Sequence, residues 1–417
     1  MNSFENKQEP ERLILIGVCV NNGRNLSETE TKESLDELEE LIKTAGGMVI
    51  HKVIQSREKI HPSTYIGKGK IAEVAELAAE LGATGVVCDD ELSPAQLSNL
   101  QQELDIKVMD RTLVILDIFA GRAVTREGKI QVELAQLRYR ATRLVGLRSS
   151  LSRLGGGIGT RGPGEKKLEI DRRLIRDRIS VLKREVEDMK QQRELARKNR
   201  EKNPVTVVAI VGYTNAGKST FLNKLTSAGV LEEDKLFATL DPTTRNYKLE
   251  SGQEILLTDT VGFIRKLPHH LIDAFRSTLE EAKYSDIIIH MVDSSNPQME
   301  AHMKTVYETL DNLGVGDKPV ITVFNKQDKL EDESVIFRDS RADYLVNASI
   351  KHGKGIDKIL QDVEEIIRNS KKYIAKTFSY NDAGKIQYIR KYGELLKEEY
   401  TEDGIYVEAY IPAEMSL

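Results

Sequence analysis

The chain has 417 residues, a length at which two to four domains are expected because one hydrophobic core rarely grows so large. Forty per cent of the residues are apolar, 6% are aromatic, 30% are charged and none is Trp, which is typical of a globular protein. The formal net charge of −5 excludes a wholly basic nucleic-acid binder, but it leaves room for a local basic region.

Membrane and secreted classes are disfavoured by the same sequence. The longest apolar run, Leu13 to Val20, is too short to cross a bilayer, and the first residues lack the basic start and apolar stretch of a secretory signal. Two cysteines, Cys19 and Cys88, cannot build a disulfide framework. We therefore expect a cytoplasmic protein with no membrane partner.

The first region, residues 1–120, alternates short apolar runs with helical periodicity. Strands are expected at 13–20, 48–50, 85–88 and 106–109, and Leu35, Leu38, Leu41 and Ile42 mark one face of a helix. This alternation predicts an α/β domain with a mostly parallel sheet covered by helices. Both cysteines fall on strands, where burial as small apolar residues is a better interpretation than a redox role.

The second region, residues 121–203, is helical and is interrupted by a glycine-rich stretch. After that stretch, from about 165 to 202, apolar residues recur every seven positions, as at Ile175, Leu182 and Met189. Such a heptad seam predicts a coiled-coil-like helical hairpin with a protruding, glycine-rich tip.

Arginines gather around this tip without compensating acids. Between Glu133 and Glu165 the chain has no acidic residue, yet it has six arginines. A charged run is usually only a solvated helical face, but arginine pairs bidentately with phosphate and stacks on bases, which favours RNA contact here. The candidate RNA-binding residues are Arg138, Arg140, Arg143, Arg148, Arg153 and Arg161.

The third region, residues 204–369, has strands at 205–211, 254–258, 286–292 and 319–324 with helical segments between them, which predicts a doubly wound domain. Residues 370–417 are expected to form a small C-terminal α/β domain. The fold class is thus multidomain α/β, with four parts.

A phosphate-binding loop follows the first strand of the third region. Gly212 to Ser219 read G-Y-T-N-A-G-K-S, which matches G-x-x-x-x-G-K-[ST] between a strand and a helix. The glycines let backbone N–H groups curl around phosphates, Lys218 is expected to reach the β- and γ-phosphates, and the Ser219 hydroxyl to bind Mg²⁺.

Two further motifs complete a guanine-nucleotide site. Asp259 ends an apolar strand and begins D-T-V-G, so its carboxylate is expected to hold Mg²⁺ through water and Gly262 to sense the γ-phosphate. Asn325 to Asp328 read N-K-Q-D, in which Asp328 can accept from guanine N1–H and the 2-amino group together. Adenine offers neither donor, so ATP is disfavoured by a factor on the order of 10⁴.

The first switch is expected between Phe237 and Arg245. A threonine there completes the Mg²⁺ shell when the γ-phosphate is present; Thr239 is preferred, and Thr243 or Thr244 could replace it. Catalytic roles are expected for Lys218, Thr239 and Gly262, and metal binding for Ser219, Thr239 and Asp259. The residues expected to contact nucleotide are Gly212, Tyr213, Thr214, Asn215, Ala216, Gly217, Lys218, Ser219, Thr220, Phe237, Ala238, Thr239, Leu240, Asp241, Asp259, Thr260, Val261, Gly262, Asn325, Lys326, Gln327, Asp328, Ser349, Ile350 and Lys351.

Two departures from common GTPase patterns are visible. Phe263 occupies the position at which many GTPases place a glutamine that orients the attacking water, so intrinsic turnover is expected to be slow, on the order of 10⁻⁴ to 10⁻² s⁻¹. Ser349-Ile350-Lys351 resembles the usual S-A-K loop at the base, with Ile350 as the difference.

These motifs, together with the stretch L-S-R-L-G-G-G-I-G-T-R-G-P-G-E at 151–165, resemble the HflX family of translational GTPases. Tyr65 to Lys70 and Gln131 to Leu137 are similar to that family's N-terminal pattern. The resemblance implies the four-part architecture above, binding to the large ribosomal subunit, GTPase stimulation by the ribosome, and GTP-dependent splitting of stalled or idle ribosomes under stress. It also implies that the hairpin tip reaches towards the peptidyl transferase centre.

The leading hypothesis is therefore a monomeric GTPase that binds GTP, GDP and Mg²⁺, contacts 23S rRNA of the 50S subunit and dissociates 70S ribosomes. A ribosome-assembly GTPase that binds the large-subunit precursor is the main alternative. An RNA-modification GTPase is a weaker one, since it would need a catalytic cysteine or a cofactor motif. Cys19 and Cys88 lie on expected core strands far from the GTPase motifs.

Overall fold

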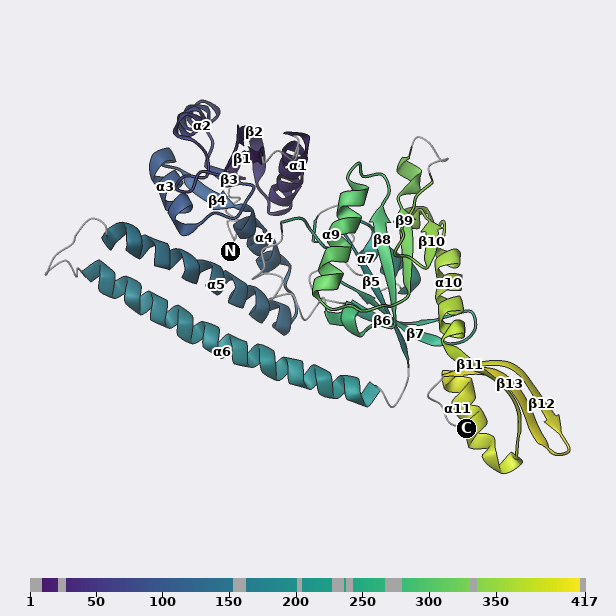
Figure 1. Cartoon of the computed structure of the whole chain (residues 1–417). Helices are drawn as coiled ribbons and strands as arrows, with labels where there is room; N and C mark the ends of the chain where they lie inside the picture. Colours follow the sequence, from purple (N-terminus) through teal and green to yellow (C-terminus); the bar gives the residue numbers. More distant parts are fainter. Residues whose placement is uncertain are drawn as a thin grey trace, which may run out of the picture. The chain divides into compact units, whose positions relative to one another are not determined.

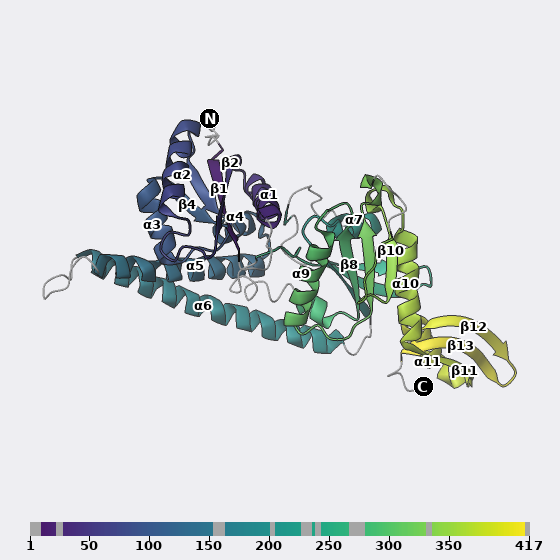
Figure 2. The same cartoon turned by 45° about the horizontal axis from the view of Figure 1, so that its top comes forward.

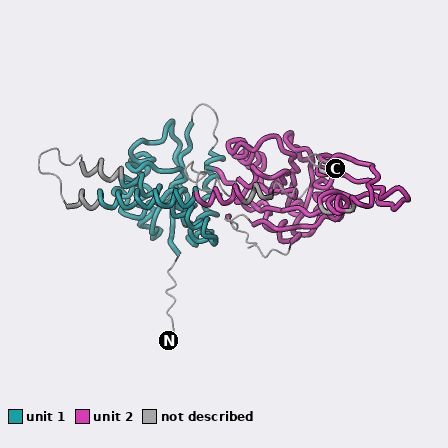
Figure 3. The backbone as a smooth tube through the Cα atoms, turned by 90° about the horizontal axis from the view of Figure 1, so that it is seen from below, with its two compact units in different colours: residues 1–187, 266–274 teal, residues 188–265, 275–417 magenta. Residues whose placement is uncertain are grey.

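The computed structural model describes residues 10–21, 28–152, 163–200, 205–226, 236–237, 243–266, 280–330 and 336–412. The chain divides into two compact units, Met1–Glu187 with Lys266–Ala274 and Asp188–Arg265 with Phe275–Leu417 (Figure 3). Among the described helices, none is both long and apolar enough to span a membrane.

The first unit contains a parallel four-stranded sheet of order β2-β1-β3-β4, covered by helices (Figure 1). Its central strand is apolar because both of its faces are covered, and Ile14, Leu15 and Ile16 are fully buried. Cys19 and Cys88 are buried free thiols, and burial raises the pKa of Cys88 well above its usual value. The elements are β1 (Arg12–Val20), α1 (Glu28–Thr44), β2 (Met48–Arg57), α2 (Lys68–Leu81), β3 (Gly85–Cys88), α3 (Pro94–Leu104), β4 (Lys107–Asp110) and α4 (Arg111–Arg122).

A helical hairpin follows this sheet. It is formed by α5 (Arg126–Ser152) and α6 (Pro163–Arg200), which run side by side in opposite directions (Figures 1 and 2). The expected seam faces inward on α6, where Leu182 is fully buried and Ile175 half-buried. On its other side α5 packs against α3 and α4.

Two ion pairs between the helices show the register of the hairpin. Glu133 Oε1 lies 2.8 Å from Arg178 Nε, and Glu185 Oε2 lies 3.6 Å from Arg126 Nη2. Residues 126 and 133 are about two helical turns apart, as are 178 and 185, so the helices are antiparallel with one constant register.

The second unit contains a six-stranded sheet of order β10-β9-β8-β5-β7-β6, in which β6 alone is antiparallel to its neighbour. The carboxyl ends of β5, β7, β8 and β9 therefore meet at one edge, where an open α/β sheet places its ligand. The elements are β5 (Thr206–Gly212), α7 (Lys218–Thr226), β6 (Thr243–Lys248), β7 (Glu254–Asp259), β8 (Ile287–Asp293), α9 (Met299–Asn312), β9 (Val320–Asn325), β10 (Tyr344–Asn347) and α10 (Ile356–Asn369).

A small antiparallel sheet of order β11-β13-β12 ends the described chain, with α11 packed on it. Its core contains Phe378, Ile389 and Val407. The elements are β11 (Lys371–Phe378), α11 (Ala383–Tyr392), β12 (Glu394–Thr401) and β13 (Gly404–Pro412).

Candidate guanine-nucleotide site

The phosphate loop connects the end of β5 to the start of α7, as the motif requires. Gly212 has φ 151°, and a Cβ there would lie 2.2 Å from the Met291 carbonyl oxygen. Gly217 has φ 100°, and its Cβ would lie 2.3 Å from Asn325 Nδ2. Both positions therefore require glycine, because neither the backbone conformation nor the space admits a side chain.

Lys218 is buried at the start of α7. Its Nζ donates to the carbonyl oxygens of Gly212 at 3.2 Å and Tyr213 at 2.9 Å. Burial lowers the pKa of Lys218 to about 8, although Asp259 acts in the opposite direction. The ammonium is thus held by carbonyls at the loop and is available to a more strongly attracting phosphate oxygen.

Ser219 and Asp259 bring two hard oxygen donors together beside the phosphate loop. Ser219 Oγ donates to Asp259 Oδ2 at 2.8 Å, and Asp259 is fully buried at the end of β7. A hydroxyl and a carboxylate fit Mg²⁺, which prefers oxygen ligands and keeps several waters. Both residues were expected to bind the metal, and the structure brings them into contact.

The D-x-x-G segment closes over the phosphate loop. Thr260 Oγ1 donates to the Ile210 carbonyl oxygen at 2.8 Å, which anchors the segment to β5. A Cβ on Gly262 would lie 2.8 Å from Thr214 Cγ2 and 3.0 Å from Lys218 Nζ. Glycine is therefore needed for the close approach that brings this backbone next to Lys218.

Phe263 is joined to the phosphate loop by its main chain. Its N–H donates to the Gly212 carbonyl oxygen at 3.1 Å, and its carbonyl accepts from Thr214 N–H at 2.9 Å. The side chain is 2% exposed and offers no hydrogen bond to water. The main chain of Phe263 thus connects the D-x-x-G segment to the phosphate loop by two hydrogen bonds.

Two aromatic rings stack beside the phosphate loop, and the motifs did not predict this pair. The Tyr213 and His302 rings are parallel within 5° with centroids 3.7 Å apart, and Tyr213 Oη accepts from Arg265 N–H at 2.8 Å. Arg265 Nη1 also donates to Gln298 Oε1 at 2.5 Å. Because these residues lie far apart in the sequence, no local pattern could have predicted the group.

Asn325 joins the base end of the site to its phosphate end. Its Nδ2 donates to the Ala216 carbonyl oxygen at 2.9 Å, and its Oδ1 accepts from Ile350 N–H at 3.0 Å. One buried amide therefore holds both the phosphate loop and the 349–351 loop.

The remaining base-binding residues follow β9. Ser349 Oγ donates to Asp328 Oδ1, and this hydrogen bond lowers the pKa of Asp328, which keeps the carboxylate ionised for guanine. Lys326 Nζ pairs with Asp293 Oδ2 at 2.8 Å. Ile350 is fully buried in the core of the domain, so the residue that differs from the usual S-A-K loop serves packing, while Lys351 is exposed.

Only part of the expected first switch is described. Phe237 is buried with φ 56°, whereas residues 238–242, including the preferred Thr239, Ala238, Leu240 and Asp241, lie outside the described residues. The two alternative threonines lie on β6, where the Thr244 hydroxyl is 3.0 Å from that of Thr258.

The hairpin arginines fall into three groups. Arg140 is exposed and Arg138 half-buried. Arg143 is held by Asp110 Oδ2 at 2.7 Å and lies over the Tyr139 ring at 3.1 Å. Arg148 lies on α5 without a described side chain, and Arg153 and Arg161 lie outside the described residues.

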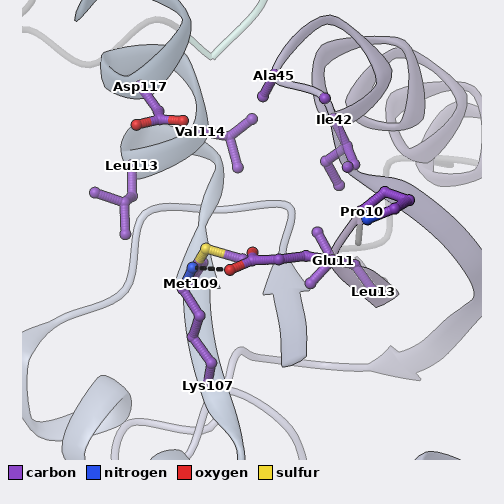
Figure 4. Close-up of a pocket in the computed structure, with 12 residues that line it drawn as sticks. Pro10, Glu11, Leu13, Ile42, Ala45, Lys107, Met109, Leu113, Val114 and Asp117 are labelled. Carbon is purple, nitrogen blue, oxygen red and sulfur yellow. Dashed lines mark hydrogen bonds and ion pairs between the residues drawn. The ribbon is translucent and has the colours of Figure 1, made fainter. Parts of the chain in front are cut away.

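A separate cavity of about 490 Å³ lies in the first unit between α1, α4 and the starts of β1 and β4 (Figure 4). Leu13, Ile42 and Leu113 form apolar walls, and Lys107 Nζ is paired with Glu11 Oε1 at 2.6 Å. Glu11 and Asp117 make the lining net acidic, which does not suit a second nucleotide phosphate. The lining does not include residues 67–70.

Comparison with known proteins gives matches over most of the chain. Family models described as "GTP-binding GTPase N-terminal", "GTP-binding GTPase Middle Region" and "50S ribosome-binding GTPase" match residues 32–120, 122–200 and 207–326. A protein named GTPase HflX from Lacrimispora saccharolytica is 67% identical over 99% of this chain and 96% of its own length. The chain belongs to the HflX family.

Other HflX proteins agree with this assignment. Those of Caldanaerobacter subterraneus and Escherichia coli are 46% and 42% identical, over 98% and 87% of this chain and 92% and 84% of their own lengths. A solved GTP-binding protein from Sulfolobus solfataricus in complex with GDP is 23% identical, with a TM-score of 0.44 over 85% of this chain and 98% of that chain. As a member of the HflX family, the protein binds guanine nucleotides and hydrolyses GTP.

Proposed function

We propose that this HflX-family GTPase binds the large ribosomal subunit and, in its GTP state, dissociates stalled or idle 70S ribosomes during stress. The observation that carries the proposal is the combination of a guanine-nucleotide site with an arginine-rich hairpin on one chain. The match of residues 207–326 to a model described as a 50S ribosome-binding GTPase supports the choice of partner. Such a protein acts in the cytoplasm as a monomer.

The hairpin is the proposed RNA-contacting part. Its run of six arginines without an acid between 133 and 165 gives a local positive charge in a chain of net charge −5. Such a segment attracts phosphates, while the acidic remainder limits indiscriminate binding. Of the six predicted arginines, Arg143 is engaged by Asp110 at 2.7 Å, so the proposed contacts to 23S rRNA are the other five, Arg138, Arg140, Arg148, Arg153 and Arg161.

Mg²⁺ is the proposed cofactor. Ser219, Thr239 and, through water, Asp259 would hold it, and the ion would neutralise charge on the β- and γ-phosphates. Lys218 and the Gly262 N–H are the chain's own contributions to the γ-phosphate. Because Phe263 cannot orient water, we propose that hydrolysis is slow in the free protein and is accelerated when the ribosome orders the switches.

Light scattering of purified 70S ribosomes tests the proposal. The full-length protein with a non-hydrolysable GTP analogue should lower the scattering, and GDP should not. Binding to 50S subunits without a fall in scattering would favour the assembly role, and no association would overturn both.

Single-turnover phosphate release gives a second test. The free protein should hydrolyse GTP at about 10⁻⁴ to 10⁻² s⁻¹, and ribosomes should raise the rate at least about 100-fold. Turnover of several per second by the free protein would contradict a ribosome-dependent switch.

A further inference from the structure

A recess of about 500 Å³ lies between α5 and α6, on the glycine-rich side of the Glu133–Arg178 ion pair. Moving seven residues along each helix from that pair leads to Arg140 and Asp171, which both line the recess. The lining consists of Arg140, Arg143, Leu144, Asp171, Leu174 and Ile175.

The walls of this recess are aliphatic and its rim is charged. Leu174 is 62% exposed, so part of the apolar wall is open to solvent. Arg143 is fixed in place by Asp110 and Tyr139, so it forms a rigid wall. Among the described residues, no hydrogen bond or ion pair reaches the Arg140 guanidinium or the Asp171 carboxylate.

These features together fit an unstacked nucleotide better than a bare phosphate or a second protein. The six arginines of the surrounding segment select a polyanion. Guanidinium planes stack on unpaired bases, and apolar side chains also pack against a base that has left its stack. A carboxylate at the rim of the recess repels phosphate but accepts from the exocyclic amino group of a base.

We propose that this recess binds one unpaired nucleotide of a folded RNA. Its base lies against Leu144 and Leu174, an amino group of the base donates to Asp171, and its phosphate remains outside against Arg140. The site rests on the proposed function, because the RNA that the hairpin meets is the rRNA of the 50S subunit.

Matched substitutions on α6 test the recess with the full-length protein, 50S subunits and a non-hydrolysable GTP analogue. Leu174→Glu places a charge at the mouth of the recess. Ile170→Glu places the same charge one turn away, at a side chain that is 58% exposed and does not line it. Both variants add one negative charge to the hairpin, so the difference between them isolates the recess. We expect Leu174→Glu to bind at least about tenfold more weakly than Ile170→Glu.

Asp171→Ala removes both the charge and the acceptor oxygens, and the sign of its effect on binding tests the role of the carboxylate. If Asp171 accepts from a base, its loss weakens binding several-fold. If Asp171 merely faces phosphate, removal of its charge strengthens binding, and that result would overturn the base contact.

Chemical probing identifies the nucleotide. Dimethyl sulfate and kethoxal should find one unpaired adenine, cytosine or guanine that the wild type and Ile170→Glu protect and Leu174→Glu does not. Equal affinity and equal protection by the two glutamate variants would overturn the site while leaving the proposed function intact. Failure of the wild type to bind 50S subunits would overturn both.

Discussion

Asn325 donates a hydrogen bond to the carbonyl oxygen of Ala216 at 2.9 Å, so the residue that begins the base motif holds the phosphate loop in place. The other end of the same amide accepts from Ile350. Guanine recognition and phosphate binding therefore share one buried side chain, and neither loop can shift without breaking a bond to it.

Asn325→Ala should weaken the binding of GDP and GTP alike by at least about tenfold. The Ala216 carbonyl and the Ile350 N–H would each lose a buried hydrogen-bond partner, and each loss costs about 1–3 kcal/mol. The preference for guanine over adenine should remain, because Asp328 is untouched. Titration with fluorescent GDP and ADP analogues measures both quantities, and exposed Asn246→Ala on β6 is the control. Loss of guanine preference with unchanged affinity would contradict this bridging role.

Asp328→Asn should relax guanine selection. The hydrogen bond from Ser349 lowers the pKa of Asp328, so its carboxylate is ionised throughout the neutral range and accepts from both guanine donors. An amide turns a donor towards guanine N1–H but can pair with the carbonyl of xanthine. We expect GTP affinity to fall at least about 100-fold and xanthosine triphosphate affinity to rise. Unchanged GTP affinity in a competition titration would argue against Asp328 as the base reader.

Replacing different arginines of the hairpin should affect different properties: one reduces the stability of the fold, and three others reduce ribosome binding. Arg143→Ala leaves fully buried Asp110 without its ion-pair partner, so the free energy of unfolding should fall by about 3–5 kcal/mol. The triple replacement of Arg148, Arg153 and Arg161 by Ala should leave the Tm unchanged and weaken ribosome binding. The slope of log affinity against log salt should become shallower by about one per arginine. Differential scanning calorimetry and salt titrations separate these effects, and an unchanged slope would exclude phosphate contacts at the tip.

Acid should destabilise the second unit through its buried histidines. Burial lowers the pKa of His302 to about 4, as it does that of His290, so both are neutral at pH 7. The unfolded chain binds these protons near pH 6.5, whereas the folded chain binds them only near pH 4. The stability that the two neutral histidines contribute is therefore complete above pH 6.5 and is lost as the pH falls towards 4.

His302→Phe keeps an aromatic ring against Tyr213 and removes one titrating group. Between pH 7 and pH 4.5 the variant should lose about 1–2 kcal/mol less free energy of unfolding than the wild type. This figure is reduced from the full pKa shift because His302 is only partly buried. Urea unfolding of both proteins at the two pH values measures this difference in the free energy of unfolding. An equal fall in the variant would show that other groups control acid sensitivity.

Much of the fold could be predicted because the central strands are long and apolar. The strands expected at 13–20, 205–211 and 319–324 are confirmed as β1, β5 and β9 within one residue at each end. Two strands, β6 and β10, were not predicted from the sequence, and both lie at sheet edges. β6 is polar, and in β10 only Val346 is buried, so neither strand has the run of apolar residues from which a buried strand can be recognised.

The site was predictable to the extent that its residues are adjacent in sequence. Local motifs identified Lys218, Asp259 and Asn325 because phosphate and base chemistry restrict residue types at fixed spacings. The stack of Tyr213 on His302 and the bond from Asn325 to Ala216 join segments about 90 and 109 residues apart, so only folding reveals them.

The constant register of Glu133 with Arg178 and Arg126 with Glu185 has a mechanical consequence. Helix α5 has 27 residues and is about 40 Å long, and the two ion pairs join its first two turns to α6 in one register. A tilt of the whole hairpin by about 5° about the N-terminal end of α5 would displace the far end of that helix by about 3–4 Å. A small rearrangement at the N-terminal end of α5 thus produces a displacement at its other end that is as large as the spacing between stacked bases.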